Sequence, residues 1–312
     1  MGVDLGPLRS RSQNYGLLAQ LVATGFDEHL LPILRLSPQY APSLQGRDVQ
    51  ELATIHERTF GFDLSPFAGA YLDPRGRVGG PLRGRLEQNL VAIGAQPGHP
   101  TAEPESLSEQ LALLSRLVGG EVEGWENERP EEWQGFQLAQ GLVLHQHLLP
   151  WLPPVTVALG LQSEAPYQVL GQALWDCAHH HVQELDARCT GYQMPMVSGP
   201  DGGALLADPS TGLAQIAEFL VRPFDSGWYL SRSDLAGIAE SNGCSLAPGP
   251  RRQMMEDLLH LLDVASLIGA LSQRVDRWRV GYEALHAPEQ VQPWIERLDQ
   301  AHRVVAGLRA AV

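Results

Sequence analysis

The sequence predicts an all-α protein, and three observations support this fold class. Apolar residues recur at helical spacing in most segments of the 312-residue chain. No segment alternates apolar and polar residues with the period of two that a half-buried strand requires. Two capping boxes, Ser106–Glu109 and Ser231–Asp234, precede helical runs. We therefore expect a multi-helix bundle with an extended helical region at its C-terminal end.

The first part of the chain contains four predicted helices and one loop. Apolar spacing predicts helices over residues 11–36 (with a weak point at Gly25), 47–60, 81–94 and 107–118. Gly119 and Gly120 are expected to stop the last of these. Residues 61–80 carry five glycines, two prolines and several aromatic anchors. We expect this segment to be an ordered loop, because linkers rarely carry Phe and Tyr so densely.

Residues 136–159 form the most distinctive stretch. Its first half is apolar on one helical face. Three prolines within five residues then remove three backbone donors, so a helix cannot pass through them unbent. We expect a helix to enter, turn at a Pro-Trp-Leu-Pro-Pro knee with Trp151 packed at its centre, and leave as a second apolar segment. The prolines are Pro150, Pro153 and Pro154.

A helix is predicted over residues 164–189, and the composition changes after it. Residues 191–209 are rich in Gly and Pro, which marks the best internal boundary. Further helices are expected over 210–221, 231–241, 250–285 and 289–310. The predicted organisation is a helical domain (1–190), a linker (191–209) and a C-terminal helical extension packed on the first domain (210–312).

The composition excludes several functions. The net charge is −14, from 22 basic and 36 acidic residues, which argues against nucleic acid or an anionic membrane as the main partner. The chain contains Arg but no Lys, so it cannot hold a Walker A loop, a pyridoxal Schiff base or a kinase core. Three cysteines without a CxxC pair fit a reducing cytosol. We see neither a signal-peptide pattern nor a membrane span, and expect a cytoplasmic protein.

The strongest local indication of metal chemistry is the run of three histidines at residues 179–181. On a helix, Asp176, His180 and Glu184 share one face and could bind zinc or iron. Adjacent histidines point about 100° apart, and no second ligand-rich helix is evident, so a solvated polar face is the preferred interpretation. A helical metal-binding protein or enzyme that uses these three residues is the alternative hypothesis. No catalytic constellation is found, and the preferred prediction is that the protein is not an enzyme.

Three features favour binding over catalysis. They are loop 61–80, the knee at Trp151, and an acidic zone over residues 103–132 with nine acidic residues against two Arg. Aromatic anchors bind apolar segments, and carboxylates bind Arg or Lys. The alternatives are an ordinary core with a solvated acidic face, and a structural scaffold without a ligand.

Several ordered passages resemble motifs of a known family. Residues 65–76, Ser-Pro-Phe-Ala-Gly-Ala-Tyr-Leu-Asp-Pro-Arg-Gly, are similar to a loop of the form P-[YH]-E-S-x-Y-L-D-P-x-G. Residues 147–153 are similar to an H-L-x-x-W-x-P helix, and Pro166-Tyr167 to a P-F-Y segment. Residues 104–107 stand where P-D-H-L is usual. In this order and spacing, over about residues 11–190, the chain resembles the TorD/DmsD/NarJ family of molybdoenzyme maturation chaperones.

The chain also departs from the family pattern. Residues 67–69, Phe-Ala-Gly, replace the aromatic-Glu-Ser core of the loop motif, and Ser106 stands where the family often has His. The C-terminal 120 or so residues are longer than in compact members. Residues 218–235 resemble an extension of longer members. The residues that carry this last resemblance are Arg222, Ser226, Gly227, Ser231 and Arg232.

The resemblance implies a TorD-like bundle and a cytoplasmic chaperone. Members bind the twin-arginine signal peptide or N-terminal segment of an apo molybdenum oxidoreductase subunit until molybdopterin guanine dinucleotide is inserted. We therefore expect no permanently bound cofactor, at most a transient contact with molybdopterin guanine dinucleotide, and a monomer or weak homodimer. The expected peptide-contacting residues are Pro66, Phe67, Tyr71, Glu103, Glu105, Glu109, His147, Trp151 and Pro153.

Overall fold

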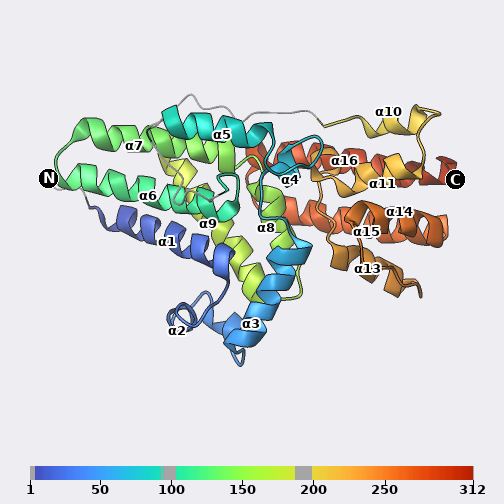
Figure 1. The fold of residues 1–312 in the computed structure, drawn as a ribbon, viewed down its shortest axis with the longest axis horizontal. Helices are drawn as coiled ribbons and strands as arrows, with labels where there is room; N and C mark the ends of the chain where they lie inside the picture. Colours follow the sequence, from blue (N-terminus) through green and yellow to red (C-terminus); the bar gives the residue numbers. More distant parts are fainter. Residues whose placement is uncertain (1–3, 93, 95–102, 187–198, 312) are drawn as a thin grey trace.

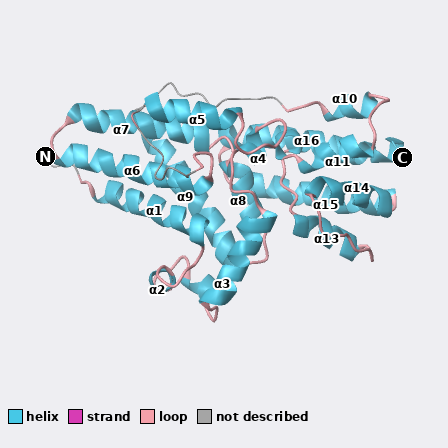
Figure 2. Ribbon diagram, viewed as in Figure 1, coloured by secondary structure: helices cyan, strands magenta, loops and turns pink. Residues whose placement is uncertain are grey.

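A computed structural model describes residues 4–92, 94, 103–186 and 199–311 of the chain. These residues are mostly helical (Figure 2) and contain no β-strand; only Phe67 and Ser106 form an isolated bridge. The prediction of an all-α protein is confirmed. No helix within the described ranges is long and apolar enough to cross a membrane.

Four helices form the bundle of the N-terminal half of the molecule. They are α1 (Gly6–Thr24), α6 (Leu107–Glu126), α7 (Pro130–Val143) and α9 (Ala165–Asp186). Helix α6 packs against α1 and α7, and α9 contacts both of these helices. Figure 1 shows α6 between α1 and α7. Helix α5 (Pro81–Ala92) bonds through Asn89 to Gln146, just beyond the end of α7.

Helix α6 continues through Gly119 and Gly120, where the sequence predicted its end. A Cβ on Gly120 would lie 2.5 Å from Cζ of Phe136, and a Cβ on Gly124 would lie 2.9 Å from the backbone nitrogen of Trp133. The glycines therefore allow α7 to approach α6 closely. This packing outweighs the low helix propensity of glycine.

The predicted helix 11–36 is divided at Gly25, which adopts a φ of 77° after the end of α1. Two short turns follow, α2 (Leu31–Leu34) and the 3-10 helix η1 (Ala41–Leu44). Helix α3 (Val49–His56) then runs directly into a π-helix, η2 (Glu57–Asp63). The rest of loop 61–80 contains only the single turn α4 (Gly69–Leu72), so the prediction of an ordered loop is correct for most of this segment.

The predicted knee is present, but its prolines differ in their roles. Helix α7 passes into the π-helix η3 (Leu144–Leu148), the chain turns at Pro150 and Trp151, and α8 (Leu152–Gly160) begins. Pro153 and Pro154 lie in the first turn of α8, where a missing N–H costs no intrahelical bond. Only Pro150 therefore lies in the break, and the other two begin the next helix.

Seven helices build the C-terminal half. They are α10 (Gly202–Ala207), α11 (Leu213–Val221), α12 (Pro223–Ser226), α13 (Arg232–Ser241), α14 (Arg251–Leu261), α15 (Val264–Glu283) and α16 (Pro288–Ala311). The predicted helix 250–285 is divided because Asp263 caps α15, accepting the N–H groups of Ala265 and Ser266. Helix α10 lies within the predicted linker, and residues 187–198 of that linker lie outside the described residues.

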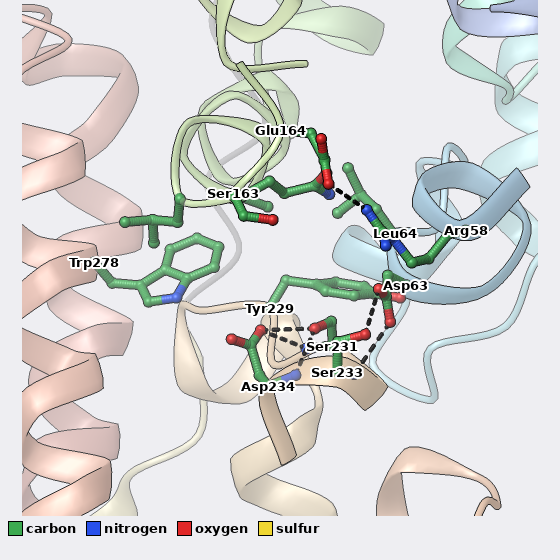
Figure 3. Close-up of a pocket in the computed structure, with 13 residues that line it drawn as sticks. Arg58, Asp63, Leu64, Ser163, Glu164, Tyr229, Ser231, Ser233, Asp234 and Trp278 are labelled. Atoms are coloured by element: carbon green, nitrogen blue, oxygen red, sulfur yellow. Dashed lines mark hydrogen bonds and ion pairs between the residues drawn. The ribbon is translucent and has the colours of Figure 1, made fainter. Parts of the chain in front are cut away.

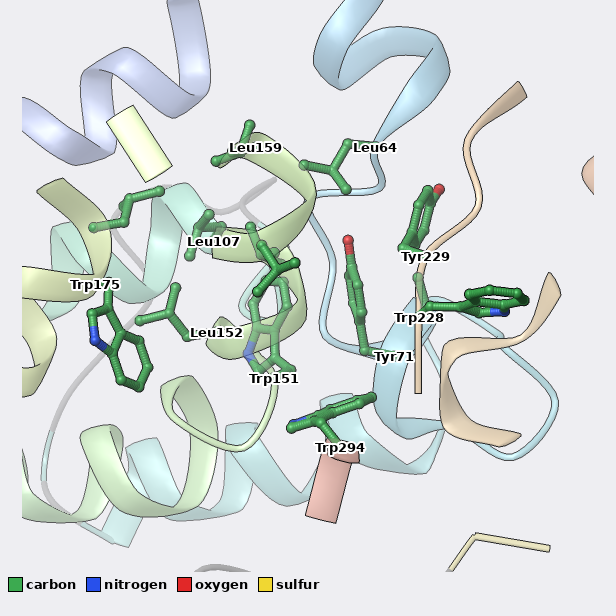
Figure 4. Packing of buried hydrophobic residues seen from close by; sticks show 14 of the residues in the cluster. Leu64, Tyr71, Leu107, Trp151, Leu152, Leu159, Trp175, Trp228, Tyr229 and Trp294 are labelled. Carbon is green, nitrogen blue, oxygen red and sulfur yellow. The ribbon is translucent and has the colours of Figure 1, made fainter. Parts of the chain in front are cut away.

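Helix α8 connects the two halves. It packs on α9 in the N-terminal half and on α15 and α16 in the C-terminal half. The buried apolar side chains of both halves belong to one cluster. Figure 4 shows aromatic rings at its centre: the ring centroids of Tyr71 and Trp151 are 5.4 Å apart, and those of Tyr71 and Tyr229 are 5.5 Å apart. Apolar burial, the main driving force of folding, thus spans the seam between the halves.

Candidate functional site

A surface pocket of about 390 Å³ lies between the C-terminal end of α1, η2, loop 61–80 and the start of α6. Four of the predicted peptide-contacting residues line it, namely Pro66, Phe67, Glu103 and Glu109. His56 and Phe60 add two further aromatic rings, which meet edge to face with centroids 5.4 Å apart. The pocket therefore combines aromatic surface with carboxylates.

The backbone of loop 61–80 is fixed to the start of α6. The N–H of Ala68 donates to the carbonyl of Glu105 at 3.0 Å, and the N–H of Leu107 donates to the carbonyl of Pro66 at 2.8 Å. The hydroxyl of Ser106 caps α6 by accepting the N–H of Glu109 at 3.2 Å. These bonds hold the loop and the first turn of α6 together on one rim of the pocket.

The pocket lining carries three carboxylates, Glu57, Glu103 and Glu109, and no Arg. Glu103 pairs with Arg83 at 2.7 Å, whereas no Arg of the described residues pairs with Glu57 or Glu109. Burial lowers the pKa of His56, whose Nδ1 lies 3.1 Å from the hydroxyl of Tyr167, so this imidazole is neutral at pH 7. The pocket is therefore anionic and suited to a basic ligand.

Glu105 lies beneath the loop and not in the pocket. It is 1% exposed, and its carboxylate accepts the backbone N–H of Gly79. Burial raises the pKa of Glu105. A Cβ on Gly69 would lie 2.3 Å from the carbonyl oxygen of Arg77, which explains the glycine in this tight fold of the chain. The expectation that Glu105 contacts a peptide is wrong, because its carboxylate supports the loop.

The acidic zone 103–132 does not form one patch. Helix α6 is 20 residues long, or roughly 30 Å, and separates its first-turn carboxylates from those at its C-terminal end. Glu121, between the two groups, is 2% exposed. The far group lies at the α6–α7 turn, next to Trp125 and Trp133, whose rings stack with centroids 4.1 Å apart. The predicted acidic patch beside the aromatic loop is therefore limited to the N-terminal end of α6.

Tyr71, Trp151 and Pro153 belong to the core. Tyr71 and Trp151 are 0% exposed, and Pro153 is buried in the first turn of α8. The indole N–H of Trp151 donates to the carbonyl of His147 at 2.7 Å, and the hydroxyl of Tyr71 donates to the carbonyl of Ser65 at 3.0 Å. The expectation that these three side chains contact a peptide is wrong, because they hold the knee and the loop against each other.

His147 connects η3 to α5 and does not line the pocket. Its Nε2 lies 2.9 Å from the amide nitrogen of Asn89. An amide N–H can only donate, so Nε2 accepts and the ring proton is on Nδ1. Burial lowers the pKa of His147 to about 4, so the ring is neutral at pH 7. His147 therefore makes a structural hydrogen bond to α5 and lies outside the lining of this pocket.

Two of the five residues that resemble the family's extension, Arg222 and Arg232, connect the C-terminal half to loop 61–80 and η2. Arg222 donates to the carbonyl of Pro74 at 2.9 Å, and Arg232 donates to the carbonyl of Phe62. Ser231 forms the predicted capping box of α13. The hydroxyl of Ser226 donates to the carbonyl of Arg222 at 2.8 Å. These residues act within the chain, at the seam between its halves.

Gly227 makes the tightest contact of this segment. It adopts a φ of 74°, and its carbonyl accepts the hydroxyl of Tyr282 at 2.5 Å. A Cβ at this position would lie 2.5 Å from the backbone nitrogen of Leu298 and from the carbonyl oxygen of Trp294. Only glycine fits here, because both the positive φ and the close approach of α16 exclude a side chain.

The alternative metal site is not formed. His180 Nδ1 donates to the backbone carbonyl of Asp176 at 2.7 Å, and the carboxylate of Asp176 accepts from Gln172 at 2.8 Å. Glu184 pairs with Arg11 at 2.5 Å. Within the described ranges no three His, Cys, Asp or Glu side chains converge on a common point. The shared helical face is used for local hydrogen bonds and an ion pair.

His181 is the buried member of the histidine run, and the sequence interpretation passed over it. It is 0% exposed; its Nδ1 accepts the hydroxyl of Tyr15 at 3.0 Å, and its Nε2–H donates to the side chain of Gln140 at 2.9 Å. Gln140 in turn donates to Glu121 at 2.9 Å. Burial lowers the pKa of His181 to about 3. In the sequence, this network is indicated only by Gln140 and Glu121, two polar residues on otherwise apolar helical faces.

The pocket residues His56, Glu57 and Phe60 were not predicted. Their spacing predicts an ordinary helix over 47–60, because a π-helix has no periodicity that distinguishes it in so short a segment. The one feature of the sequence that points to an aromatic surface here is the pair Phe60 and Phe62, on either side of Gly61.

The chain was compared with known proteins. No protein-family model matches the sequence. No curated protein and no solved structure matches it either. The function is therefore inferred from the pocket and from the motifs of the sequence.

Proposed function

We propose that this protein is a chaperone of the TorD/DmsD/NarJ type, which binds an arginine-containing N-terminal segment of an apo enzyme subunit. The single observation that supports this function best is the pocket of η2, loop 61–80 and α6. It carries aromatic rings and three carboxylates, and its lining contains no Arg. A peptide with an Arg pair followed by a mildly apolar run complements both properties.

The physics of such binding follows from the side chains on the rim. Glu57 and Glu109 have no Arg partner among the described residues, so a guanidinium can bind them without breaking an existing ion pair. Charge-assisted hydrogen bonds of this kind are stronger than neutral ones. Phe60 and Phe67 are each partly exposed and can bury apolar surface of the peptide. The net charge of −14 also favours encounter with a cationic segment.

The contacts among the motif residues support the family proposal. The ring of Tyr71, in the first passage, packs at a tilt of 36° against that of Trp151 in the second. Tyr167 of the third passage lies with its ring centroid 6.0 Å from that of Phe60, at the wall of the pocket. Residues of the three passages, far apart in the sequence, thus belong to one buried cluster. Ser106, at the position of the family's frequent His, serves as the cap of α6.

The proposed client is the apo catalytic subunit of a molybdenum oxidoreductase, bound through its twin-arginine signal peptide or N-terminal segment. Molybdopterin guanine dinucleotide is the cofactor of that client, and the proposal includes at most a transient contact with it. The proposed setting is the cytoplasm, before export or assembly of the client, and the proposed state is a monomer or weak homodimer.

The test is a fluorescence-anisotropy titration with a labelled twin-arginine peptide. We expect micromolar binding that weakens as salt rises from low to physiological ionic strength, because partly exposed charges are screened. The double variant Glu57→Gln and Glu109→Gln should weaken binding about tenfold, or roughly 1.4 kcal/mol. A peptide with both Arg residues changed to Gln should bind weakly to the unmodified protein.

The matched control is the double variant Glu123→Gln and Glu131→Gln. It makes the same change in net charge at two exposed positions, one near the C-terminal end of α6 and one in the first turn of α7. It should leave the affinity within about twofold, because Glu123 lies roughly 20 Å along α6 from Glu109. Equal losses in both double variants would attribute binding to net charge and contradict a specific pocket. An absence of binding to any twin-arginine peptide would reject the proposed function.

A further inference from the structure

A second pocket, of about 280 Å³, lies at the seam between the two halves (Figure 3). Its lining comes from η2, the turn between α8 and α9, the start of α13, and α15. The π-helix η2 is the only element that lines both this pocket and the candidate peptide pocket of about 390 Å³ described above. It lines the two pockets with different residues. It is therefore a separate site.

The charged groups of this seam pocket are already paired within the protein. Glu164 pairs with Arg58 at 2.7 Å and with Arg47 at 3.0 Å. Asp234 pairs with Arg274, and Asp63 accepts the backbone N–H and the hydroxyl of a serine of α13, Ser233. A cationic ligand would therefore have to displace existing partners. An anionic ligand would meet three carboxylates against one Arg in the lining.

One indole N–H of the seam pocket makes no hydrogen bond to the described residues and is open to the pocket. Five tryptophans of the described residues are at most 2% exposed. Four of them donate the indole N–H to a backbone carbonyl: Trp151, Trp175, Trp228 and Trp294. The fifth, Trp278, makes no hydrogen bond to the described residues, and it lines the pocket. In Figure 3 the nitrogen edge of its indole is turned toward the side of the pocket formed by Tyr229 and Asp234.

The amide of Gln162 provides a second donor. Its oxygen accepts the hydroxyl of Thr59 at 3.1 Å, and its nitrogen has no acceptor among the described residues. Leu64 and Leu161 contribute apolar surface beside these groups. The pocket thus presents two neutral N–H donors next to aliphatic walls, and a ligand that offers acceptor oxygens complements them.

We propose that the seam pocket binds a small uncharged ligand rich in hydroxyl oxygens, of the polyol or monosaccharide class. Its oxygens accept from Trp278 and Gln162, and its hydroxyl groups donate to the carboxylate oxygens of the lining. Its carbon skeleton packs on the leucine side chains. Because the lining comes from both halves, the bound ligand strengthens the seam and stabilises the folded protein. This inference is independent of the proposed peptide binding.

The test is isothermal titration calorimetry of the full chain with matched probes. The neutral probes are glucose, sorbitol and myo-inositol, and the charged analogues are glucosamine and glucuronate. We expect saturable binding of at least one neutral probe at millimolar or lower concentration, with the charged analogues at least about tenfold weaker. If none of the neutral probes binds, or if a charged analogue binds more tightly, the proposal is rejected.

Variants assign the binding to this pocket. Trp278→Phe removes the N–H but breaks no hydrogen bond to the described residues, so the chain should fold and bind the neutral probe at least about tenfold more weakly. Ala158→Leu, on the pocket wall, should block it by filling the space. The matched control is Trp175→Phe, which removes an N–H already bonded to Leu285 and should leave the affinity unchanged. Unchanged affinity in both pocket variants would place the binding elsewhere and overturn the proposal.

Discussion

The hydroxyl of Tyr229 accepts the backbone N–H of Ser65 at 3.1 Å, across 164 residues of sequence. The carbonyl of the same Ser65 accepts the hydroxyl of Tyr71 at 3.0 Å. The rings of the two tyrosines lie 5.5 Å apart between centroids. One residue of the pocket-bearing loop thus has both backbone polar groups bonded to tyrosines, one from each half of the molecule. The C-terminal half therefore takes part in positioning the candidate site.

Tyr229→Phe should lower the free energy of unfolding by about 1 kcal/mol, because it leaves a partly buried N–H without its acceptor. Urea denaturation followed by circular dichroism measures this change. The control is Tyr40→Phe, since the hydroxyl of Tyr40 is buried and has no hydrogen-bond partner among the described residues. Removal of that hydroxyl should be neutral or slightly stabilising. Similar losses in the two variants would show that the bond to Ser65 contributes nothing.

Trp151→Ala should lower the free energy of unfolding by about 3–5 kcal/mol, because the indole is 0% exposed in the core. The affinity of the folded protein for a twin-arginine peptide should be unchanged. Phe67→Ala is the matched comparison, since this ring is only partly buried and lines the pocket. It should cost less stability and more affinity. If Trp151→Ala reduced affinity as strongly as Phe67→Ala, the knee would have a direct role in binding.

Two buried histidines should make the fold sensitive to acid. The pKa of His147 is lowered to about 4 and that of His181 to about 3, each from an ordinary 6.5. Below pH 6.5 these two histidines are protonated in the unfolded chain but stay neutral in the folded chain. The free energy of unfolding therefore falls as pH decreases toward 4. Each group contributes up to about 1.4 kcal/mol per pH unit in this window and nothing above it. Asp225, whose pKa is raised to about 6, acts in the opposite direction between pH 6 and 3.8 and offsets part of the loss.

The His147→Gln variant isolates one of these contributions. Glutamine can still accept from Asn89 and does not titrate, so the free energy of unfolding should fall less steeply between pH 7 and 5 than in the unmodified protein. Urea denaturation at several pH values measures the slope. His29→Gln, at an exposed position, is the control and should leave the slope unchanged. Identical slopes for all three proteins would mean that His147 takes up a proton in the fold at its ordinary pKa.

Gly227→Ala should be strongly destabilising, by about 3–5 kcal/mol, because a Cβ would be both strained and in collision with α16. Gly243→Ala separates the two causes. Gly243 has nearly the same φ, 73°, but nothing lies within 4 Å of its Cβ position. This control should cost only the strain, roughly 1–2 kcal/mol. Thermal or urea unfolding compares the two, and equal costs would exclude a role for the contact with α16.

Part of the candidate site could be predicted from local sequence. Phe67 and Pro66 stand out as apolar anchors in a glycine-rich loop, and Ser106 caps α6 as predicted, although its N–H donates to the carbonyl of Glu103 and not to Glu109. These features depend on neighbours a few residues away. Glu57 and Phe60 could not be assigned to the pocket, because their exposure depends on how η2 meets the start of α6, about 50 residues later.

The sequence by itself determined the all-α class, most helix termini and the turn at Pro150, because apolar spacing, caps and prolines act through local backbone geometry. Only the tertiary structure decided that His181 of the histidine run is buried, that Gly120 is a contact point for Phe136, and that Trp151 does not line the pocket. Each of these outcomes depends on which side chain of a distant helix occupies the neighbouring space. Periodicity defines an apolar face, but close packing between helices selects its partner.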